Sequence, residues 1–391
     1  MTTLRISQRA QRVEPFYVME LAKAAADMAR QASAGSRPMI YLNIGEPDFT
    51  APPLVQAAAE RAIREGRTQY TPATGLPALR EAISGWYASH FGLSIDPARI
   101  VVTAGASAAL QLACLALIEA GDEVLMPDPS YPCNRQFVQA AEGRPVLIPS
   151  GPEERYQLSA EHVWTAWGPS TRGVLLASPS NPTGTSIARD ELERIARFVR
   201  EKGGVTLVDE IYLGLSYEEQ FGHTALAIAD DIISINSFSK YFNMTGWRLG
   251  WIVARRDLVQ KATQLNEFIV SHAASMIQKA GEVALRQGED EVAALLEQLQ
   301  ERRDFAAGAM ASVARINLPK PEGAFYLFPQ IDGVEDSFAF CLQLLKTERV
   351  SLAPGSAFGA GGEGSVRLCF ASDMSVLEPA LERFCRFVER Y

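Results

Sequence analysis

The sequence predicts an α/β fold with a mainly parallel central sheet covered by helices, joined to a smaller α+β domain. Two observations predict the sheet: short apolar runs recur through the middle of the chain, and amphipathic stretches with helical spacing separate several of them. Such alternation is typical of βαβ units, whose strands pair in parallel beneath helices on both faces. A third observation, a charged helical stretch followed by alternating runs after residue 290, predicts the smaller domain.

The expected strands of the large domain are short, apolar and rich in β-branched residues. They are residues 100–104, 123–127, 173–178, 205–210, 232–236 and 250–254. One expected helix begins near Ser107 and ends at Gly121, because apolar residues recur at helical spacing and glycine commonly ends a helix. A second expected helix covers residues 188–204, with Gly203 near its end.

The last hundred residues have a different pattern. Residues 290–311 read as a charged amphipathic helix, residues 323–329 and 365–371 as strands, and residues 375–391 as a closing helix. We expect these elements to combine with the N-terminal segment. The predicted division is a large domain of residues 48–285 and a small domain of residues 1–47 and 286–391.

Charge and cysteine content limit the partners that we expect. The chain carries 37 Lys and Arg against 46 Asp and Glu, a net charge of −9, whereas nucleic acids and anionic membranes select basic surfaces. We therefore expect neither as a partner. The five cysteines are scattered, which is typical of reduced thiols in the cytoplasm, and the four histidines are not clustered, which disfavours a metal site.

Four of the expected strands end in polar segments that are capable of chemistry. These segments are TAGAS (103–107), SPSNPTG (178–184), DEIY (209–212) and SFSK (237–240). In an open α/β sheet, ligands bind outside the carboxyl ends of the strands. The convergence of four such ends at one edge of the sheet predicts a ligand site there.

Each candidate taken alone also has an ordinary structural explanation. TAGAS (103–107) is either an anion site at a helix start or a simple strand-to-helix turn. Asp209 either binds a cationic ligand or has a structural role as a helix cap or in a salt bridge. Lys240 is either a reactive lysine or a solvated lysine in a loop. Arg248 begins a strand pattern, where its planar fork suits phosphate or carboxylate. Arg367 either binds an anion or lies on the solvent face of a strand.

The combination is more specific than its parts. Pyridoxal phosphate needs a lysine with which to form a Schiff base, donors for its phosphate, and an acid beside its pyridine nitrogen. The sequence resembles the class I and II aminotransferases of the pyridoxal-phosphate fold-type I superfamily, from NIGEPDF (43–49) to VRLCF (366–370). The motifs between these are YTPATGLPALR (70–80), SNPTG (180–184), DEIY (209–212), SFSK (237–240) and MTGWRLG (244–250).

The resemblance implies a role for each residue around the cofactor ring. Lys240 would form the Schiff base and later move the proton, and Asp209 would keep the pyridine nitrogen protonated. Tyr212 and Asn181 would hydrogen-bond the 3-oxygen of the ring, and Tyr131 would stack on its face. The catalytic residues would thus be Lys240, Asp209 and Tyr212.

The resemblance also implies a phosphate site, a substrate site and a second subunit. The phosphate would be held by Gly105, Ala106, Ser107, Ser237 and Arg248. Arg367 would grip the substrate α-carboxylate, helped by Asn181 and the backbone of Gly45. Tyr70 would reach the phosphate bound to the neighbouring subunit, so the active unit would be a homodimer with shared active sites.

The implied activity is transamination between an L-amino acid and a 2-oxo acid, with pyruvate or 2-oxoglutarate as acceptor. The alternative is a carbon–sulfur β-lyase, since the same fold and cofactor serve both reactions. The retained Lys240 disfavours a catalytically silent regulator. Residues 105–109 contain no Lys or Arg to pair with a carboxylate on the substrate side chain, although the partner subunit could donate an arginine. Residues 13–21 and the loops around Tyr131 and Phe358 are apolar and aromatic. These features predict a neutral or aromatic amino acid.

Overall fold

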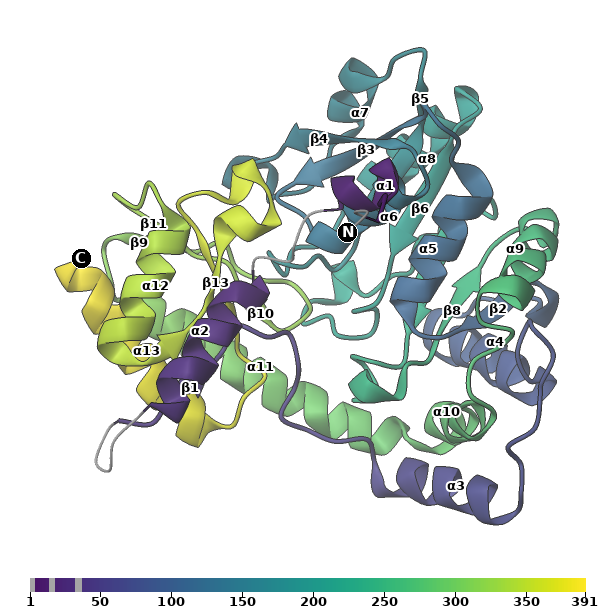
Figure 1. Ribbon diagram of the computed structural model, residues 1–391, viewed down its shortest axis with the longest axis horizontal. Helices are drawn as coiled ribbons and strands as arrows, with labels where there is room; N and C mark the ends of the chain where they lie inside the picture. Colours follow the sequence, from purple (N-terminus) through teal and green to yellow (C-terminus); the bar gives the residue numbers. More distant parts are fainter. Residues whose placement is uncertain (1–3, 14–17, 32–36) are drawn as a thin grey trace.

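The computed structural model describes residues 4–13, 18–31 and 37–391, and its centre is a seven-stranded sheet (Figure 1). The strand order is β2-β8-β7-β6-β5-β3-β4. The strands are β2 (Ile100–Thr103), β3 (Glu123–Asp128), β4 (Arg144–Pro149), β5 (Thr171–Ala177), β6 (Val205–Asp209), β7 (Ile233–Ser237) and β8 (Gly250–Val253). Neighbours from β4 to β7 pair in parallel, whereas β8 is antiparallel to both β7 and β2. The predicted α/β class with a mainly parallel sheet is confirmed.

Helices cover both faces of this sheet because successive strand side chains point to opposite sides. Leu175 and Leu207 pack into a cluster with α5, α6 and α9, and Val174 and Val208 pack into a separate cluster with α7 and α8. The helices are α5 (Ala106–Leu117), α6 (Pro132–Ala140), α7 (Ala160–Ala166), α8 (Arg189–Glu201) and α9 (Arg256–Ile269). Apart from the edge strand β4, which is partly exposed, the strands are buried on both faces, and this burial explains their near-continuous apolar runs.

The remaining elements include those of the predicted small domain. The strands are β1 (Ile40–Tyr41), β9 (Ile316–Asn317), β10 (Tyr326–Leu327), β11 (Gln330–Ile331), β12 (Val350–Ser351), β13 (Ala353–Pro354) and β14 (Val366–Cys369). The helices are α1 (Gln8–Arg12), α2 (Val18–Arg30), α3 (Pro53–Arg64), α4 (Pro77–Phe91), α10 (Ser275–Gln287), α11 (Glu289–Ala311), α12 (Ser337–Glu348) and α13 (Met374–Arg390). Figure 1 shows α2, α12 and α13 gathered on one side of the molecule, with α11 running from them toward α10.

The N-terminal segment contacts the C-terminal part of the chain through strand pairing. β1 pairs in parallel with β12, and β14 lies between β10 and β13 in an antiparallel sheet. The boundaries at residues 47 and 285 stay a prediction. One hydrophobic cluster crosses them, because it contains Leu21 and Phe370 together with Trp251 of the large sheet.

The predicted elements differ from the structure in several places. The sequence reading missed β4, whose prolines at 145 and 149 are tolerated because β4 is an edge strand. The strand predicted over residues 323–329 is reduced to β10, because the preceding Ala324 has a φ of +57° and leaves the extended conformation. The helix predicted to end at Gly121 stops at Leu117.

Candidate active site

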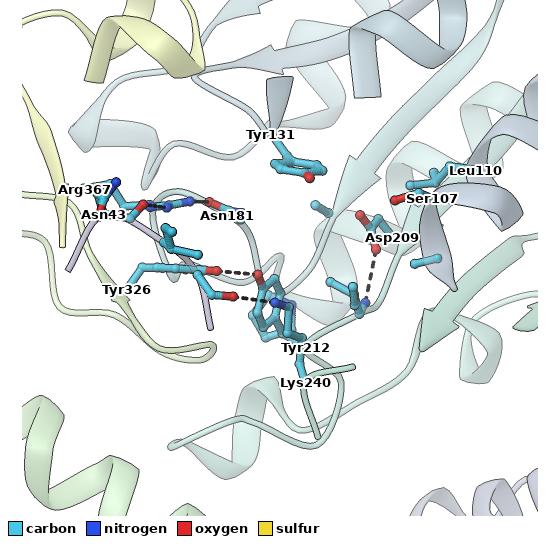
Figure 2. A pocket seen from close by; sticks show the side chains of 16 residues that line it. Asn43, Ser107, Leu110, Tyr131, Asn181, Asp209, Tyr212, Lys240, Tyr326 and Arg367 are labelled. Atoms are coloured by element: carbon cyan, nitrogen blue, oxygen red, sulfur yellow. Dashed lines mark hydrogen bonds between the residues drawn. The ribbon is translucent and has the colours of Figure 1, made fainter. Parts of the chain in front are cut away.

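A cavity of about 220 Å³ lies at the carboxyl ends of β5 and β6, next to the segment that follows β7 (Figure 2). Predicted site residues form much of its lining. They are Gly45, Ala106, Ser107, Tyr131, Asn181, Asp209, Tyr212, Lys240 and Arg367. The tertiary structure therefore brings these residues from separate elements into one place.

Lys240 lies three residues beyond the end of β7, and its side chain points into the cavity (Figure 2). Its amine donates a hydrogen bond to the carbonyl oxygen of Gly45 at 2.5 Å. Burial, with smaller contributions from the positive charges of Arg367 and Arg248, lowers the pKa of Lys240 to about 8. A lysine with this pKa provides a substantial fraction of neutral amine near pH 8, which nucleophilic attack on a carbonyl requires.

Asp209 is the last residue of β6 and is only 5% exposed. Its carboxylate accepts a hydrogen bond from the backbone N–H of Ile211 at 3.2 Å, and no side chain among the described residues forms a hydrogen bond or ion pair with it. Burial raises its pKa to about 6. A buried carboxylate without a cation is costly, so this position suits a ligand that brings a positive charge.

The predicted anion site lies at the N-terminus of α5. Gly105 is the N-cap residue with a φ of +85°, and a Cβ at this position would lie 2.5 Å from a terminal nitrogen of Arg248. Arg248 donates to the carbonyl oxygen of Thr245 at 2.7 Å, and Ser237 is buried with its hydroxyl 2.8 Å from that of Ser239. Free N–H groups at a helix start, an arginine and hydroxyl groups together suit a phosphate. Gly105, Ser237 and Arg248 lie outside the cavity lining itself.

Arg367 lies in β14 and is 3% exposed, so the alternative that it sits on a solvent face is wrong. One terminal nitrogen donates to the side-chain oxygen of Asn181 at 2.9 Å, and the other to the carbonyl oxygen of Asn43 at 2.6 Å. The centre of the guanidinium group lies 4.5 Å from the ring of Tyr326 and 4.9 Å from the ring of Phe358. Each terminal nitrogen carries a second N–H, so the oriented fork can still bind a carboxylate.

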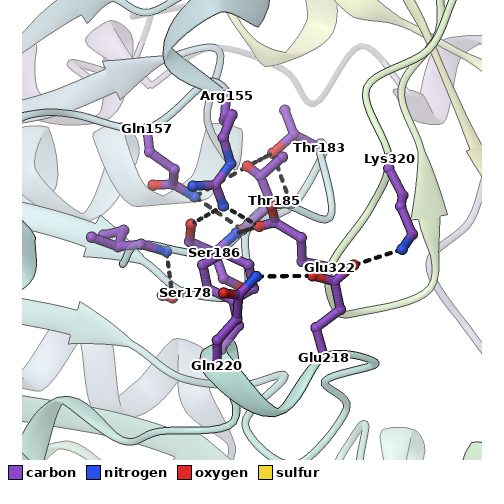
Figure 3. A network of polar contacts seen from close by, with 12 residues as sticks. Arg155, Gln157, Ser178, Thr183, Thr185, Ser186, Glu218, Gln220, Lys320 and Glu322 are labelled. Atoms are coloured by element: carbon purple, nitrogen blue, oxygen red, sulfur yellow. Dashed lines mark hydrogen bonds and ion pairs between the residues drawn. The ribbon is translucent and has the colours of Figure 1, made fainter. Parts of the chain in front are cut away.

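A polar network fixes the loop that carries Asn181 against the segment that leads to β10 (Figure 3). The Glu322 carboxylate accepts from the backbone N–H of Ser186 at 2.8 Å and pairs with Arg155. The backbone N–H groups of Glu322 and Gly323 donate to the carbonyl oxygen of Gly184 at 2.8 and 2.9 Å. This network links two segments that contribute to the cavity lining, one through Asn181 and one through Tyr326.

Of the lining residues that sequence reasoning missed, two have polar side chains, Tyr326 and Asn43. The hydroxyl oxygen of Tyr326 lies 2.7 Å from that of Tyr212. The sequence contains the tyrosine within an apolar aromatic run, and that composition does not tell which side chain of the run faces a ligand. Asn43 contributes its backbone carbonyl to Arg367, and a backbone contact leaves no residue-type signal.

One predicted residue lies apart from the site. Tyr70 is 91% exposed, and its ring contacts the ring of His272 edge-on at 5.5 Å. A single chain therefore does not bring Tyr70 to its own cavity. The apolar segment 13–21 that entered the specificity prediction falls partly outside the described residues, at positions 14–17.

The described part of the chain contains no group of three or more His, Cys, Asp or Glu side chains arranged to bind a metal ion. None of the helices within those same ranges is long and apolar enough to cross a lipid bilayer.

The residues at the site fit pyridoxal phosphate. The buried Asp209 carboxylate lacks a cation partner among the described side chains, which suits a protonated pyridine nitrogen. Gly105 has no side chain, so the space beside the Arg248 guanidinium stays open. This space suits the phosphate of the cofactor. The amine of Lys240, at the cavity wall, is the group that the cofactor aldehyde requires.

Comparison with known proteins agrees with this chemistry. The family model described as aminotransferase class I and II matches residues 37–384. The chain is 36% identical over 355 residues to an aspartate aminotransferase from Pyrococcus horikoshii, covering 90% of this chain and 91% of the relative. It is 36% identical over 385 residues to a valine–pyruvate aminotransferase from Mycobacterium tuberculosis, covering 97% and 98%. A crystal structure of an aminotransferase from Mycobacterium tuberculosis superposes with a TM-score of 0.94 at 35% identity, over 100% of both chains. The chain therefore belongs to the class I and II aminotransferases, a family of pyridoxal-phosphate-dependent transferases.

Proposed function

We propose that the protein transfers an amino group between an L-amino acid with a neutral or aromatic side chain and a 2-oxo acid, with Lys240 as the covalent anchor of pyridoxal phosphate. The observation that carries this proposal is the convergence of the Lys240 amine, the Asp209 carboxylate and the Arg367 fork on one cavity. These three groups match the aldehyde and ring nitrogen of the cofactor and the α-carboxylate of an amino acid.

Each residue has a physical task in this proposal. When bound, pyridoxal phosphate supplies a ring that withdraws electrons from the substrate Cα. Asp209 stabilises a proton on the ring nitrogen, because an ionised carboxylate in a buried site favours a neighbouring positive charge. Lys240 carries a proton at its Nζ, and its lowered pKa of about 8 allows both gain and loss of that proton near neutral pH. Arg367 orients the substrate by its carboxylate.

The cavity lining supports a neutral or aromatic substrate side chain. Among the described residues that line it, the cations are Lys240 and Arg367, and both already have a role. The lining otherwise includes Ile44, Leu110 and Tyr131, which favour apolar contact. The names of the relatives differ in substrate, aspartate in one and valine in the other, so the specificity proposal rests on the lining.

We further propose a homodimer in which Tyr70 completes the phosphate site of the neighbouring subunit. Two observations support this assembly: Tyr70 is 91% exposed, and Phe268 on α9 is 90% exposed. Large exposed aromatic side chains are typical of protein interfaces. The net charge of −9 supports small molecules rather than nucleic acids or anionic membranes as partners, and the five unpaired cysteines support the cytoplasm as the compartment.

The test is a panel of amino donors with pyruvate and with 2-oxoglutarate, followed by the absorbance of the cofactor and by the 2-oxo acid produced. We expect phenylalanine, tyrosine or leucine to exceed aspartate at least about tenfold in kcat/KM, because aspartate would place a second carboxylate against apolar side chains. A preference for aspartate would contradict the specificity. Release of ammonia and pyruvate from a cysteine S-conjugate without any acceptor would indicate the β-lyase alternative instead. Borohydride reduction and peptide mapping must find the cofactor on Lys240.

A further inference from the structure

Tyr326 lines the cavity and has no role in the chemistry described above. It lies in β10, opposite Cys369 of β14 in the antiparallel register, and is 1% exposed. Figure 2 shows its side chain extending from the Arg367 side of the cavity toward Tyr212. Its two ends therefore meet two different parts of the site.

The hydroxyl end contacts Tyr212, with 2.7 Å between the two oxygens. A phenol has a single proton to donate. If Tyr212 donates its proton to the 3-oxygen of the cofactor, its own oxygen must accept, and Tyr326 must be the donor. Burial raises the pKa of Tyr326 above its ordinary value, so the hydroxyl keeps the proton that this arrangement needs.

The ring of Tyr326 supports Arg367. The guanidinium carbon lies 4.5 Å from the ring centre, within the range of a cation–π contact. Hydrogen bonds to Asn181 and to the Asn43 carbonyl set the guanidinium position from its edges, and the tyrosine ring sets it from one face. The ring thus contacts Arg367, which is assigned to the substrate carboxylate, and the hydroxyl contacts Tyr212, which is assigned to the cofactor.

Gly45 leaves the space that this arrangement needs. A Cβ at residue 45 would lie 1.9 Å from the Tyr326 oxygen, so any other residue would displace the hydroxyl. The carbonyl of the same glycine accepts the hydrogen bond from Lys240. The position of Tyr326 is therefore coupled by direct contact to the segment that meets the catalytic lysine.

We propose that Tyr326 is a positioning residue that orients the Tyr212 phenol through its hydroxyl and the Arg367 fork through its ring. The proposal rests on the proposed function, because it assigns Tyr212 to the cofactor and Arg367 to the substrate carboxylate. It makes one side chain responsible for two separable properties. Those properties are the protonation of the bound cofactor and the affinity for a carboxylate.

Substitutions can separate the two properties. Tyr326→Phe removes the hydroxyl and keeps the ring, whereas Tyr326→Leu removes both. A donor hydrogen bond to the 3-oxygen favours the form of the cofactor that has lost its proton. Without Tyr326 as a donor, the Tyr212 phenol is a weaker donor itself. The pH midpoint of the cofactor absorbance should therefore rise in both variants, by about 0.5 pH unit.

The second measurement is the binding of 3-phenylpropionate, an unreactive carboxylate, followed by the absorbance of the loaded enzyme. We expect Tyr326→Phe to bind it within about twofold of wild type, and Tyr326→Leu to bind it about three- to tenfold more weakly, because the cation–π support is lost. Tyr217→Phe is the matched control. Tyr217 is partly buried, donates to the carbonyl oxygen of Ala324 at 2.5 Å, and does not line the cavity. It should change neither quantity.

The outcomes separate the inference from the function on which it rests. A wild-type protein whose bound cofactor shows no pH-dependent absorbance would overturn both. If the absorbance of the wild-type protein does depend on pH but Tyr326→Phe has the same pH midpoint, the proposed positioning of Tyr212 is overturned. The proposed support of Arg367 is not affected by that result. Unweakened carboxylate binding in a folded Tyr326→Leu would overturn the support of Arg367. If Tyr326→Leu does not fold, Tyr326→Ile replaces it, and the Tyr326→Phe midpoint decides the first half independently.

Discussion

At the residue scale, the site depends on charged groups held where water is scarce. Asp209 ends a buried strand, Arg367 lies between two aromatic rings, and Lys240 points into the cavity. Removing a charge from water is unfavourable unless a partner compensates it. The chain itself compensates part of the Arg367 charge, through the two oxygens that accept hydrogen bonds from it. We expect the bound ligands to compensate the rest. Two consequences can be measured on the protein without substrate.

The first residue-scale prediction concerns the rate at which apoprotein attaches pyridoxal phosphate to Lys240. A pKa lowered to about 8 means that the amine loses its proton at lower pH than an ordinary lysine, whose pKa is 10.5. About a quarter of Lys240 is then neutral at pH 7.5, against about 0.1% for an ordinary lysine. Stopped-flow absorbance should show an attachment rate that rises with pH and levels off above about 8. A rate still rising tenfold per unit at pH 9.5 would contradict the lowered pKa.

The second residue-scale prediction is that Asp209→Asn stabilises the apoprotein at neutral pH. The pKa of Asp209 is about 6 in the folded chain and 3.8 in the unfolded chain, so the folded state binds the proton more tightly. Stability is therefore lost as pH rises from 3.8 to 6, by about 3 kcal/mol in total. Asparagine carries no charge and can still accept from the Ile211 N–H.

Urea unfolding of wild-type and Asp209→Asn apoproteins at pH 5 and pH 7 measures this effect. The advantage of the variant should grow by about 1 kcal/mol between the two pH values. Pyridoxal phosphate should reverse the order, because its ring nitrogen compensates the carboxylate of the wild type only. An advantage of equal size at both pH values would show that the gain does not come from the charge.

At the scale of elements, strand ends and a helix start determine where the chemistry lies. β6 ends in Asp209, Lys240 follows β7, and α5 begins just after Gly105. Parallel strands bring their carboxyl ends to one edge, so residues far apart in the sequence meet there. The helix start contributes free N–H groups and the positive end of its dipole. Glycine is needed at this start because a side chain would occupy the space beside Arg248.

The element-scale prediction is that Gly105→Ala weakens the binding of pyridoxal phosphate by at least about tenfold. Its Cβ would lie 2.5 Å from the Arg248 guanidinium, and its φ of +85° is unfavourable for alanine. Gly121→Ala is the matched control, because Gly121 also has a positive φ, +96°, but has nothing within 4 Å of the Cβ position. Titration of both apoproteins with the cofactor, together with thermal unfolding, separates backbone strain from the loss of the anion site. Equal affinities in the two variants would mean that the phosphate binds elsewhere.

At the scale of the whole molecule, the site lies where segments from across the chain meet. Arg367 comes from the C-terminal sheet, Lys240 and Asp209 from the large sheet, and Gly45 from the segment after β1. The pairing of β1 with β12 and the network around Glu322 hold these segments together. Tyr70 is a predicted site residue that lies apart from the cavity, with its side chain 91% exposed.

The molecule-scale prediction is that two inactive variants restore activity when their subunits mix. In a hybrid of Tyr70→Phe and Lys240→Ala subunits, shared sites would place both lesions in one site and leave the other intact. Refolding the two together should then give activity above the sum of the parents, approaching about a quarter of wild type for random pairing. Chromatography with differently tagged subunits verifies that hybrids form. No gain from verified hybrids would mean that each subunit supplies its own Tyr70.

The sequence by itself determined the family, the mainly parallel sheet and the identity of the groups that carry charge. It could do so because each of these leaves a local pattern: apolar runs with helical spacing between them, glycine at a helix start, and a lysine or aspartate at the end of a strand. The edge strand β4 was not predicted, because its two prolines are uncommon in strands and interrupt the expected pattern.

Only the tertiary structure decided which neighbours those groups have. Sequence alone left Arg367 equally consistent with a solvent-facing position, and the structure places it between Tyr326 and Phe358. The contact between Tyr326 and Tyr212 joins residues 114 positions apart, and the carbonyl that Arg367 contacts is 324 positions away. Such contacts have no sequence signature, because they depend on how elements pack and on backbone atoms that every residue shares.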